Sequence, residues 1–378
     1  MIQGDDRKTD GKLEGDGEVK RVNEILQELV IQETSKKEID LQGKRLRFFE
    51  DFESLHVLDS NSVLKLNMSE NGIKSWETIS RIVAKFPNLK ELDVTSNPCL
   101  PYISDLPLTD VLEHKKTFAS VTTVSANGLG YPWGGVMTCV REMWSDRLRH
   151  LSLNHNMIHY MSDPGDALEH LVSIDLSANP IKGWQEVAKL GDLPSLKSLT
   201  LKDCGIKTIS LLPDDTDLLS DQFIRLKKLD LFHNEISDWT SVLELTRLQC
   251  LEDIDLQFNP IMSSMKNFME ADITMNALFG RYASKINGHP YDGSFTASAE
   301  EYLAIKIYEE MTLPNYPVVR MIKQSFLEEA EEKMKSVALS FLQEIEEEKL
   351  TRDQLDDFLE GMDGLDDFLA EEEDCVDM

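Results

Sequence analysis

The segment Leu171-Val-Ser-Ile174-Asp-Leu176-Ser-Ala-Asn179-Pro-Ile181 decides the fold, because its spacing of apolar residues and asparagine returns along the chain. Written as L-x-x-L-x-L-x-x-N-x-I, the pattern occurs eight times between Val63 and Ile261. At its asparagine position stand Asn71, Asn97, Leu129, Asn156, Asn179, Cys204, Asn234 and Asn259. Successive gaps of 26, 32, 27, 23, 25, 30 and 25 residues indicate a repeating architecture.

Each part of the repeat has a physical role. The alternating L-x-L predicts a short strand whose apolar side chains point inward. The asparagine amide both donates and accepts, so it can satisfy backbone groups where the chain turns. Residues 76–83 and 184–190 show the apolar spacing of helices that return along the outer side. No single repeat buries its own apolar face, whereas stacked repeats do. The sequence predicts an α/β fold, a leucine-rich-repeat solenoid of about eight repeats with helical caps and an acidic C-terminal tail.

Five segments are expected along the chain. Residues 1–37 form a charged N-terminal segment with a short amphipathic helix, and 38–62 form an N-terminal cap. The leucine-rich repeats occupy 63–285. Residues 286–350 read as a C-terminal helical cap, and 351–378 as an acidic tail predicted to be disordered.

Composition excludes several classes of partner. Among 378 residues, 69 acidic and 39 basic side chains give a formal net charge of −30, which argues against nucleic acid and anionic membranes. Residues 328–378 hold 20 acidic and 4 basic residues, a net charge of −16. Five scattered cysteines indicate reduced thiols in the cytosol or nucleus. We expect neither a signal peptide nor a transmembrane helix.

The sequence offers no motif of known catalytic chemistry, so we expect a protein that is not an enzyme and that needs no cofactor or metal. The densest histidine cluster is His150, His155 and His159, whose spacing matches no compact zinc motif. We interpret these histidines as surface residues of the repeats. Recognition of another protein is the remaining role.

Side chains between the strand leucines are expected to face outward across the concave surface. One row comprises Asn67, Asp93, Ser125, Ser152, Asp175, Thr200, Asp230 and Asp255. The predicted partner-binding residues are His155, Asp175, Lys202, Asp230, Phe232, His233, Asp255, Gln257 and Phe258. Exposed phenylalanines on neighbouring strands would anchor a partner. The alternative is that a downstream helix covers them as a cap.

The acidic tail carries a motif of its own. Leu355-Asp-Asp-Phe-Leu359 recurs ten residues later as Leu365-Asp-Asp-Phe-Leu369. Acidic-hydrophobic alternation is typical of segments that fold onto a partner's groove. The predicted docking residues are Leu355, Phe358, Leu359, Leu365, Phe368 and Leu369; the alternative is a solubilising tail that contacts nothing.

Tryptophan spacing points to a family. Trp76, Trp184 and Trp239 each follow the repeat asparagine by five residues, where we expect them to pack between repeats on the outer side. This N-x-I-x-x-W pattern resembles the repeats of tubulin-folding cofactor E. The aberrant copy at residues 121–136 and the segments Lys285-Ile-Asn-Gly288 and Ala299-Glu-Glu-Tyr-Leu303 are similar to that family as well.

The resemblance, which covers roughly residues 38–312, implies a scaffold that binds α-tubulin. It implies action with other tubulin-folding cofactors in assembly or dissociation of the αβ-tubulin heterodimer, in the cytoplasm and associated with the cytoskeleton. The family's CAP-Gly module and ubiquitin-like domain have no expected counterpart at either end. The alternative function is a generic cytosolic or nuclear leucine-rich-repeat adaptor, of a phosphatase-regulatory or an acidic histone-binding type.

Overall fold

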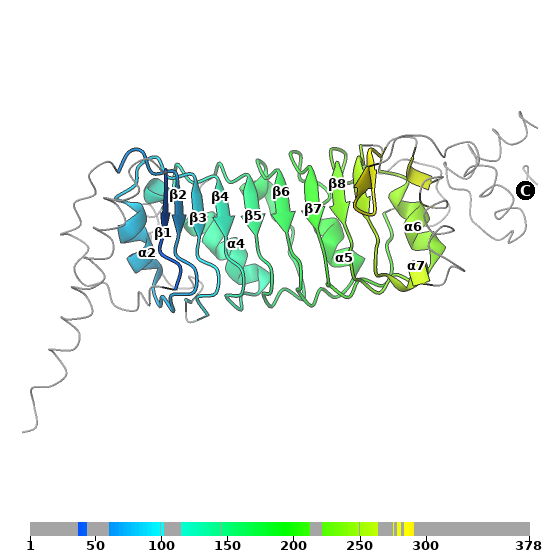
Figure 1. Ribbon diagram of the computed structural model, residues 1–378, viewed down its shortest axis with the longest axis horizontal. Coiled ribbons are helices and arrows are strands. Elements are labelled where there is room, and N and C mark those ends of the chain that lie inside the picture. Colours follow the sequence, from blue (N-terminus) through cyan, green and yellow to red (C-terminus); the bar gives the residue numbers. More distant parts are fainter. Residues whose placement is uncertain are drawn as a thin grey trace, which may run out of the picture.

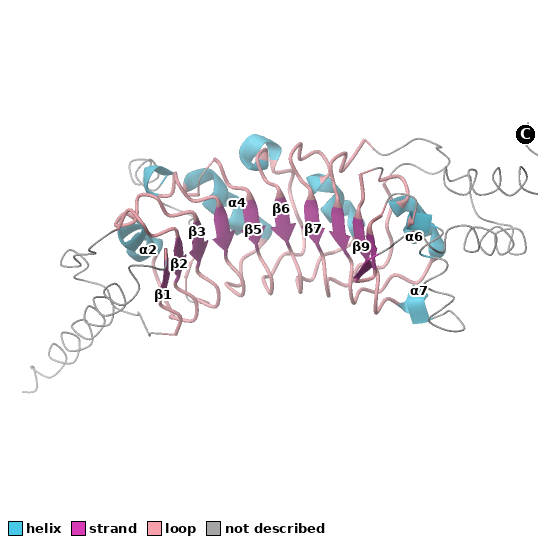
Figure 2. Ribbon diagram, turned by 45° about the horizontal axis from the view of Figure 1, so that its top comes forward, coloured by secondary structure: helices cyan, strands magenta, loops and turns pink. Residues whose placement is uncertain are grey.

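The computed structural model describes residues 37–43, 60–98, 100–101, 115–144, 146–211, 221–248, 250–263, 275, 278–280 and 283–290. Within them, short strands follow one another along the long axis of the molecule, and the helices lie on the opposite side (Figure 1, Figure 2). The expected N-terminal helix, most of the N-terminal cap, the helices of the C-terminal cap and the acidic tail lie outside these residues.

The strands form one sheet in sequence order. Each strand from β1 to β9 pairs in parallel with the next, and β11 turns back antiparallel to β10. The bounds are Glu38–Asp40 (β1), Lys65–Asn67 (β2), Glu91–Asp93 (β3), Thr123–Ser125 (β4), His150–Ser152 (β5), Ser173–Asp175 (β6), Ser198–Thr200 (β7), Lys228–Asp230 (β8), Asp253–Asp255 (β9), Lys285–Ile286 (β10) and His289–Pro290 (β11). The apolar residue in the middle of each three-residue strand is buried, as the L-x-L alternation predicts.

The sheet extends past both expected ends of the repeat region. At the start, Ile39 and Leu41 supply an apolar alternation, and Gly43 adopts a φ of 66° in the turn that follows. At the other end, Asn287 and Gly288 take φ values of 49° and 80°, the left-handed geometry of a two-residue hairpin. The expected caps at 38–62 and from 286 therefore each contribute a strand to the sheet.

A ladder of buried asparagines joins neighbouring repeats. The amide Nδ2 of Asn97 donates to the carbonyls of Met68, at 3.1 Å, and Val94, at 2.8 Å. Its Oδ1 accepts from the backbone N–H of Asn71, at 3.3 Å, and of Ile73, at 2.9 Å. Asn156, Asn179, Asn234 and Asn259 make corresponding contacts, and the Sγ of Cys204 lies 3.3 Å from the carbonyl of Leu176. The predicted role of the repeat asparagine is confirmed.

Short helices form the return path on the outer side. Their bounds are Trp76–Val83 (α2), Trp133–Glu142 (α4), Trp184–Val187 (α5), Trp239–Leu245 (α6) and Pro260–Ser263 (α7), with 3₁₀ turns at Gly165–Leu168 (η2) and Ala188–Leu190 (η3). Four of these helices begin at a tryptophan, which anchors the helix to the core. The indole Nε1 of Trp76 donates to Tyr131 Oη at 3.1 Å, and the Trp184 ring packs on Phe223. Trp239 is only partly buried.

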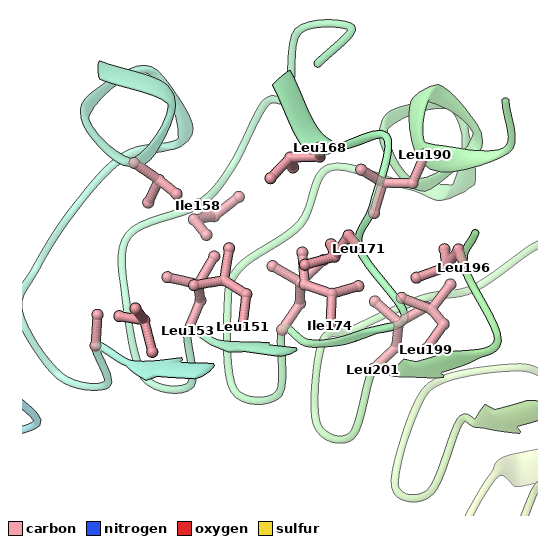
Figure 3. Packing of buried hydrophobic residues seen from close by; sticks show 14 of the residues in the cluster. Leu151, Leu153, Ile158, Leu168, Leu171, Ile174, Leu190, Leu196, Leu199 and Leu201 are labelled. Atoms are coloured by element: carbon pink, nitrogen blue, oxygen red, sulfur yellow. The ribbon is translucent and has the colours of Figure 1, made fainter. Parts of the chain in front are cut away.

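Leucine and isoleucine side chains from strands and return segments fill the space between the two sides (Figure 3). Leu151 and Ile174 come from the strands, whereas Leu168 and Leu190 come from the outer turns, and all are buried. Because successive repeats contact each other through this layer, one continuous core runs along the solenoid. The rigid sheet then holds its outward-facing side chains in fixed rows.

Candidate functional site

The outward-facing surface of the sheet, with the turns that follow its strands, is called the concave face here. Strand register places the predicted row from Asn67 to Asp255 along it, one residue per strand. Near the C-terminal end of the row, Phe232 follows β8 and Phe258 follows β9. Their ring centroids are 4.8 Å apart at an angle of 56°. Phe258 is 67% exposed and Phe232 is half-buried, so the pair presents an aromatic surface to solvent.

Phe258 has a strained backbone. The residue before the ladder asparagine adopts a positive φ in successive repeats, at Glu70, Ser96, Gly128, His155, Ala178, Asp203, His233 and Phe258. At Phe258 this angle is 60°. A bulky residue is rare in the left-handed region, where its Cβ crowds the backbone. Strain and exposure at one phenylalanine are both unfavourable for folding, and such positions concentrate at functional sites.

A cation lies beside the aromatic pair. Lys202 Nζ is 3.0 Å from the buried Asp230 carboxylate and 5.5 Å from the centroid of the Phe232 ring. The hydrogen bond that Lys202 donates to Asp230 is the largest cause that raises the pKa of Lys202, and the charges of Asp255 and Asp175 raise it further. Lys202 therefore stays protonated at neutral pH, within an acidic neighbourhood that it only partly neutralises.

Asp255 shows the excess negative charge of this region. Burial raises the pKa of its carboxyl above the ordinary value, and the charges of Asp230 and Asp253 act in the same direction. The backbone N–H of Gln257, 3.0 Å from Asp255 Oδ1, and the charge of Lys202 oppose the shift. A cation supplied by a partner would remove this unfavourable interaction.

The remaining predicted residues occupy the surroundings of the pair. Gln257 Nε2 donates to the carbonyl of Asn287 at 2.9 Å, which joins the site to the closing hairpin. His233 Nδ1 lies 3.1 Å from Asp203 Oδ1 at the surface. Asp175 accepts from the N–H and the hydroxyl of Ser177.

His155 stands apart. It is exposed in the turn after β5, three strands from β8, a separation of about 14 Å at the usual strand spacing.

Asp203 and Asp253 were not among the predicted site residues. Asp253 Oδ2 lies between Lys228, at 3.5 Å, and Lys285, at 3.6 Å. Asp253 directly precedes the buried strand residue Ile254, so the repeat pattern alone could have placed it on the outward-facing side of the sheet.

Metal sites and membrane-spanning helices were also sought in the part of the chain that the structure describes. No three His, Cys, Asp or Glu side chains converge there as metal ligands. His150 Nδ1 contacts Ser173 Oγ at 2.7 Å, and His159 Nδ1 contacts the carbonyl of Met157 at 2.9 Å. Among the same residues, no helix is both long and apolar enough to cross a bilayer. The predicted docking residues of the tail lie outside the described residues.

Comparisons with known proteins agree with the repeat motifs. A family profile described as "Leucine Rich repeat" matches residues 226–238, which contain β8. Tubulin-specific chaperone E of Mus musculus is 29% identical over 201 residues, 53% of this chain and 37% of that protein. The same protein of Xenopus laevis is 29% identical over 206 residues, 54% and 38%. Tubulin-specific chaperone cofactor E-like protein of Rattus norvegicus is 25% identical over 258 residues, 68% and 57%.

The match spans less than two thirds of the length of each of these relatives. The predicted leucine-rich-repeat fold is confirmed, and so is the resemblance to tubulin-specific chaperone E and its cofactor E-like relative.

Proposed function

We propose that this chain is a protein-binding scaffold that acts as a tubulin-folding cofactor in the cytoplasm. It binds α-tubulin on the concave face and, with other folding cofactors, assists assembly or dissociation of the αβ-tubulin heterodimer without covalent chemistry. The observation that carries the proposal is the exposed aromatic pair Phe232 and Phe258, set among aspartates. Its support from sequence is the similarity to proteins named tubulin-specific chaperones.

The chemistry of the pair defines the surface that it would accept. An aromatic side chain contributes most to the binding free energy when a partner covers it fully and excludes water. The charges of Asp255 and Asp175 act on Lys202 beside the anchor, and the raised pKa of Asp255 reflects the same acidic neighbourhood, so the matching surface is apolar with a basic rim. An aliphatic side chain beside Lys or Arg on a folded client would satisfy both requirements.

Purified αβ-tubulin binding to the immobilised full chain tests this proposal. We expect Phe232→Ala with Phe258→Ala to weaken the affinity at least about tenfold, as loss of a central aromatic anchor does. The matched control removes two other exposed apolar side chains, Met157, 56% exposed, and Tyr160, 67% exposed, by substitution to alanine. This control should bind like the wild type.

Equal losses in both double variants would show nonspecific apolar association and refute the assigned surface. No measurable binding of tubulin by the wild type would refute the proposed client. Binding of a purified phosphatase or of histones in its place would favour the adaptor alternative.

A further inference from the structure

A groove of about 850 Å³ lies on the edge of the solenoid where the chain enters β3 to β6, away from the aromatic pair. Its lining contains Lys90, Lys116, Arg147, Arg149 and His170, and no acidic side chain. This concentration of cations is unusual in a protein with a net charge of −30. The groove has the volume of sites that hold a short ligand segment.

Three of these cations are not neutralised within the described part of the chain. Lys90, Lys116 and Arg149 are exposed, and none of them has a described carboxylate within 4.0 Å. The neighbouring Lys115, by contrast, lies 2.7 Å from Asp146. Like charges held together on one edge repel each other, so an acidic segment in the groove would be stabilised by all three.

The groove is also partly apolar. Val83 and Pro87, from the end of α2 and the turn after it, line it together with Ala119. A ligand that suits this lining alternates carboxylates with apolar side chains. The chain carries that pattern twice, as Leu355-Asp-Asp-Phe-Leu359 and Leu365-Asp-Asp-Phe-Leu369.

We propose that the acidic C-terminal segment of this same chain, residues 351–378, docks in the basic groove, with Phe358 or Phe368 against the apolar lining and the aspartates beside the cations. The segment can reach the groove. Five strand spacings separate β10 from β5, about 25 Å in all. The 64 residues from 291 to 354 cover about 95 Å even at the 1.5 Å rise of a helix.

Carbodiimide cross-linking of the full chain, read by mass spectrometry, tests the proposal because it joins only amines and carboxylates in contact. We expect Lys90 and Lys116 to link within one molecule to aspartates of residues 353–367, at yields that do not change on dilution. Arg149→Glu should lower these yields at least fivefold. Lys182→Glu changes the net charge equally, at an exposed site outside the groove, and should leave them unchanged.

A second measurement uses a labelled peptide of residues 351–378 and does not depend on lysine reactivity. It should bind the full chain carrying Phe358→Ser and Phe368→Ser more tightly than the wild type, whose own segment competes at high effective concentration. Adding Arg149→Glu should abolish that binding. Tail cross-links to Lys182 as frequent as those to Lys90, or equal peptide affinity for both chains, would overturn the proposal. Neither readout involves tubulin, so failure here leaves the proposed function untouched.

Discussion

Substitution of Phe258 by asparagine tests whether its ring is part of the hydrophobic core or is free to bind a partner. Relief of the strained φ of 60° gains about 1–2 kcal/mol, because asparagine tolerates the left-handed region. Loss of the ring contact with Phe232 at 4.8 Å costs about 0.5–1.5 kcal/mol. The side chain is 67% exposed, so its removal sacrifices little further burial. We expect the net change in the free energy of unfolding to lie between a loss of about 0.5 and a gain of about 1.5 kcal/mol. Truncation of the buried Leu256 to alanine, by contrast, costs about 2–5 kcal/mol.

Urea unfolding of the full chain, followed by circular dichroism, measures this difference. Ala178→Asn is the matched control, because Ala178 has a φ of 55° at the same turn position and no aromatic partner to lose. It should stabilise the protein by about 1–2 kcal/mol, the same relief of strain without the loss of a ring contact. A loss of about 3 kcal/mol or more in Phe258→Asn would refute the reasoning, since the ring would then belong to the core.

Three further predictions concern stability. Asn179→Ala leaves the Leu153 and Leu176 carbonyls and the Ile158 N–H without their amide partner and should cost roughly 3 kcal/mol by urea unfolding; Asn179→Cys should cost less, as Cys204 occupies the equivalent position. The raised pKa of Asp255 means that the native state binds a proton more tightly than the unfolded state, so this group lowers the stability of the fold as the pH rises above 3.8. Asp255→Asn should therefore stabilise the protein more at pH 7 than at pH 4. An equal gain at both pH values would contradict the raised pKa. Lys202→Met leaves the buried Asp230 carboxylate without its cation and should lower the melting temperature, and a melting temperature equal to that of the wild type would show that the pair does not stabilise the fold.

The sequence determines the repeats because each element has a local signal. The L-x-L alternation marks every strand from β2 to β9, and an asparagine marks six of the eight inward turns, with Leu129 and Cys204 in the other two. The pattern does not predict β1, because the apolar pair Ile39 and Leu41 is followed by Gly43 and not by an asparagine. The Asn287-Gly288 hairpin has a strong local signal, a dipeptide typical of tight turns, which the leucine pattern does not include.

The site was only partly predictable. The row of outward side chains follows from the period, so the neighbourhood of Phe232 and Phe258 could be located. The ion pair of Lys202 with Asp230 joins residues on adjacent repeats separated by an insertion, and its geometry depends on strand register. The burial of Asp230 is a property of the packed solenoid and has no signature in one repeat, and the positive φ of Phe258 follows from a turn geometry that recurs before the repeat asparagine but that the leucine pattern does not reveal.

The asparagine ladder gives the solenoid a direction. Each amide oxygen accepts N–H groups from the repeat before it, as Asn234 does from Cys204 and Ile206. Losing a following repeat therefore strips the backbone donors of this turn of their acceptor. Losing a preceding repeat frees the asparagine side chain and also strips strand-entry donors, such as the N–H groups of Lys227 and Lys228 that donate to the Lys197 carbonyl. Unpaired backbone donors are poorly tolerated. Backbone donors therefore lose acceptors at either end of the solenoid, and at the C-terminal end Asn287 Oδ1 covers one of them by accepting from the N–H of Leu256. During synthesis from the N-terminus, the turn of each new repeat would therefore lack its hydrogen-bond acceptor until the asparagine of the next repeat has been made.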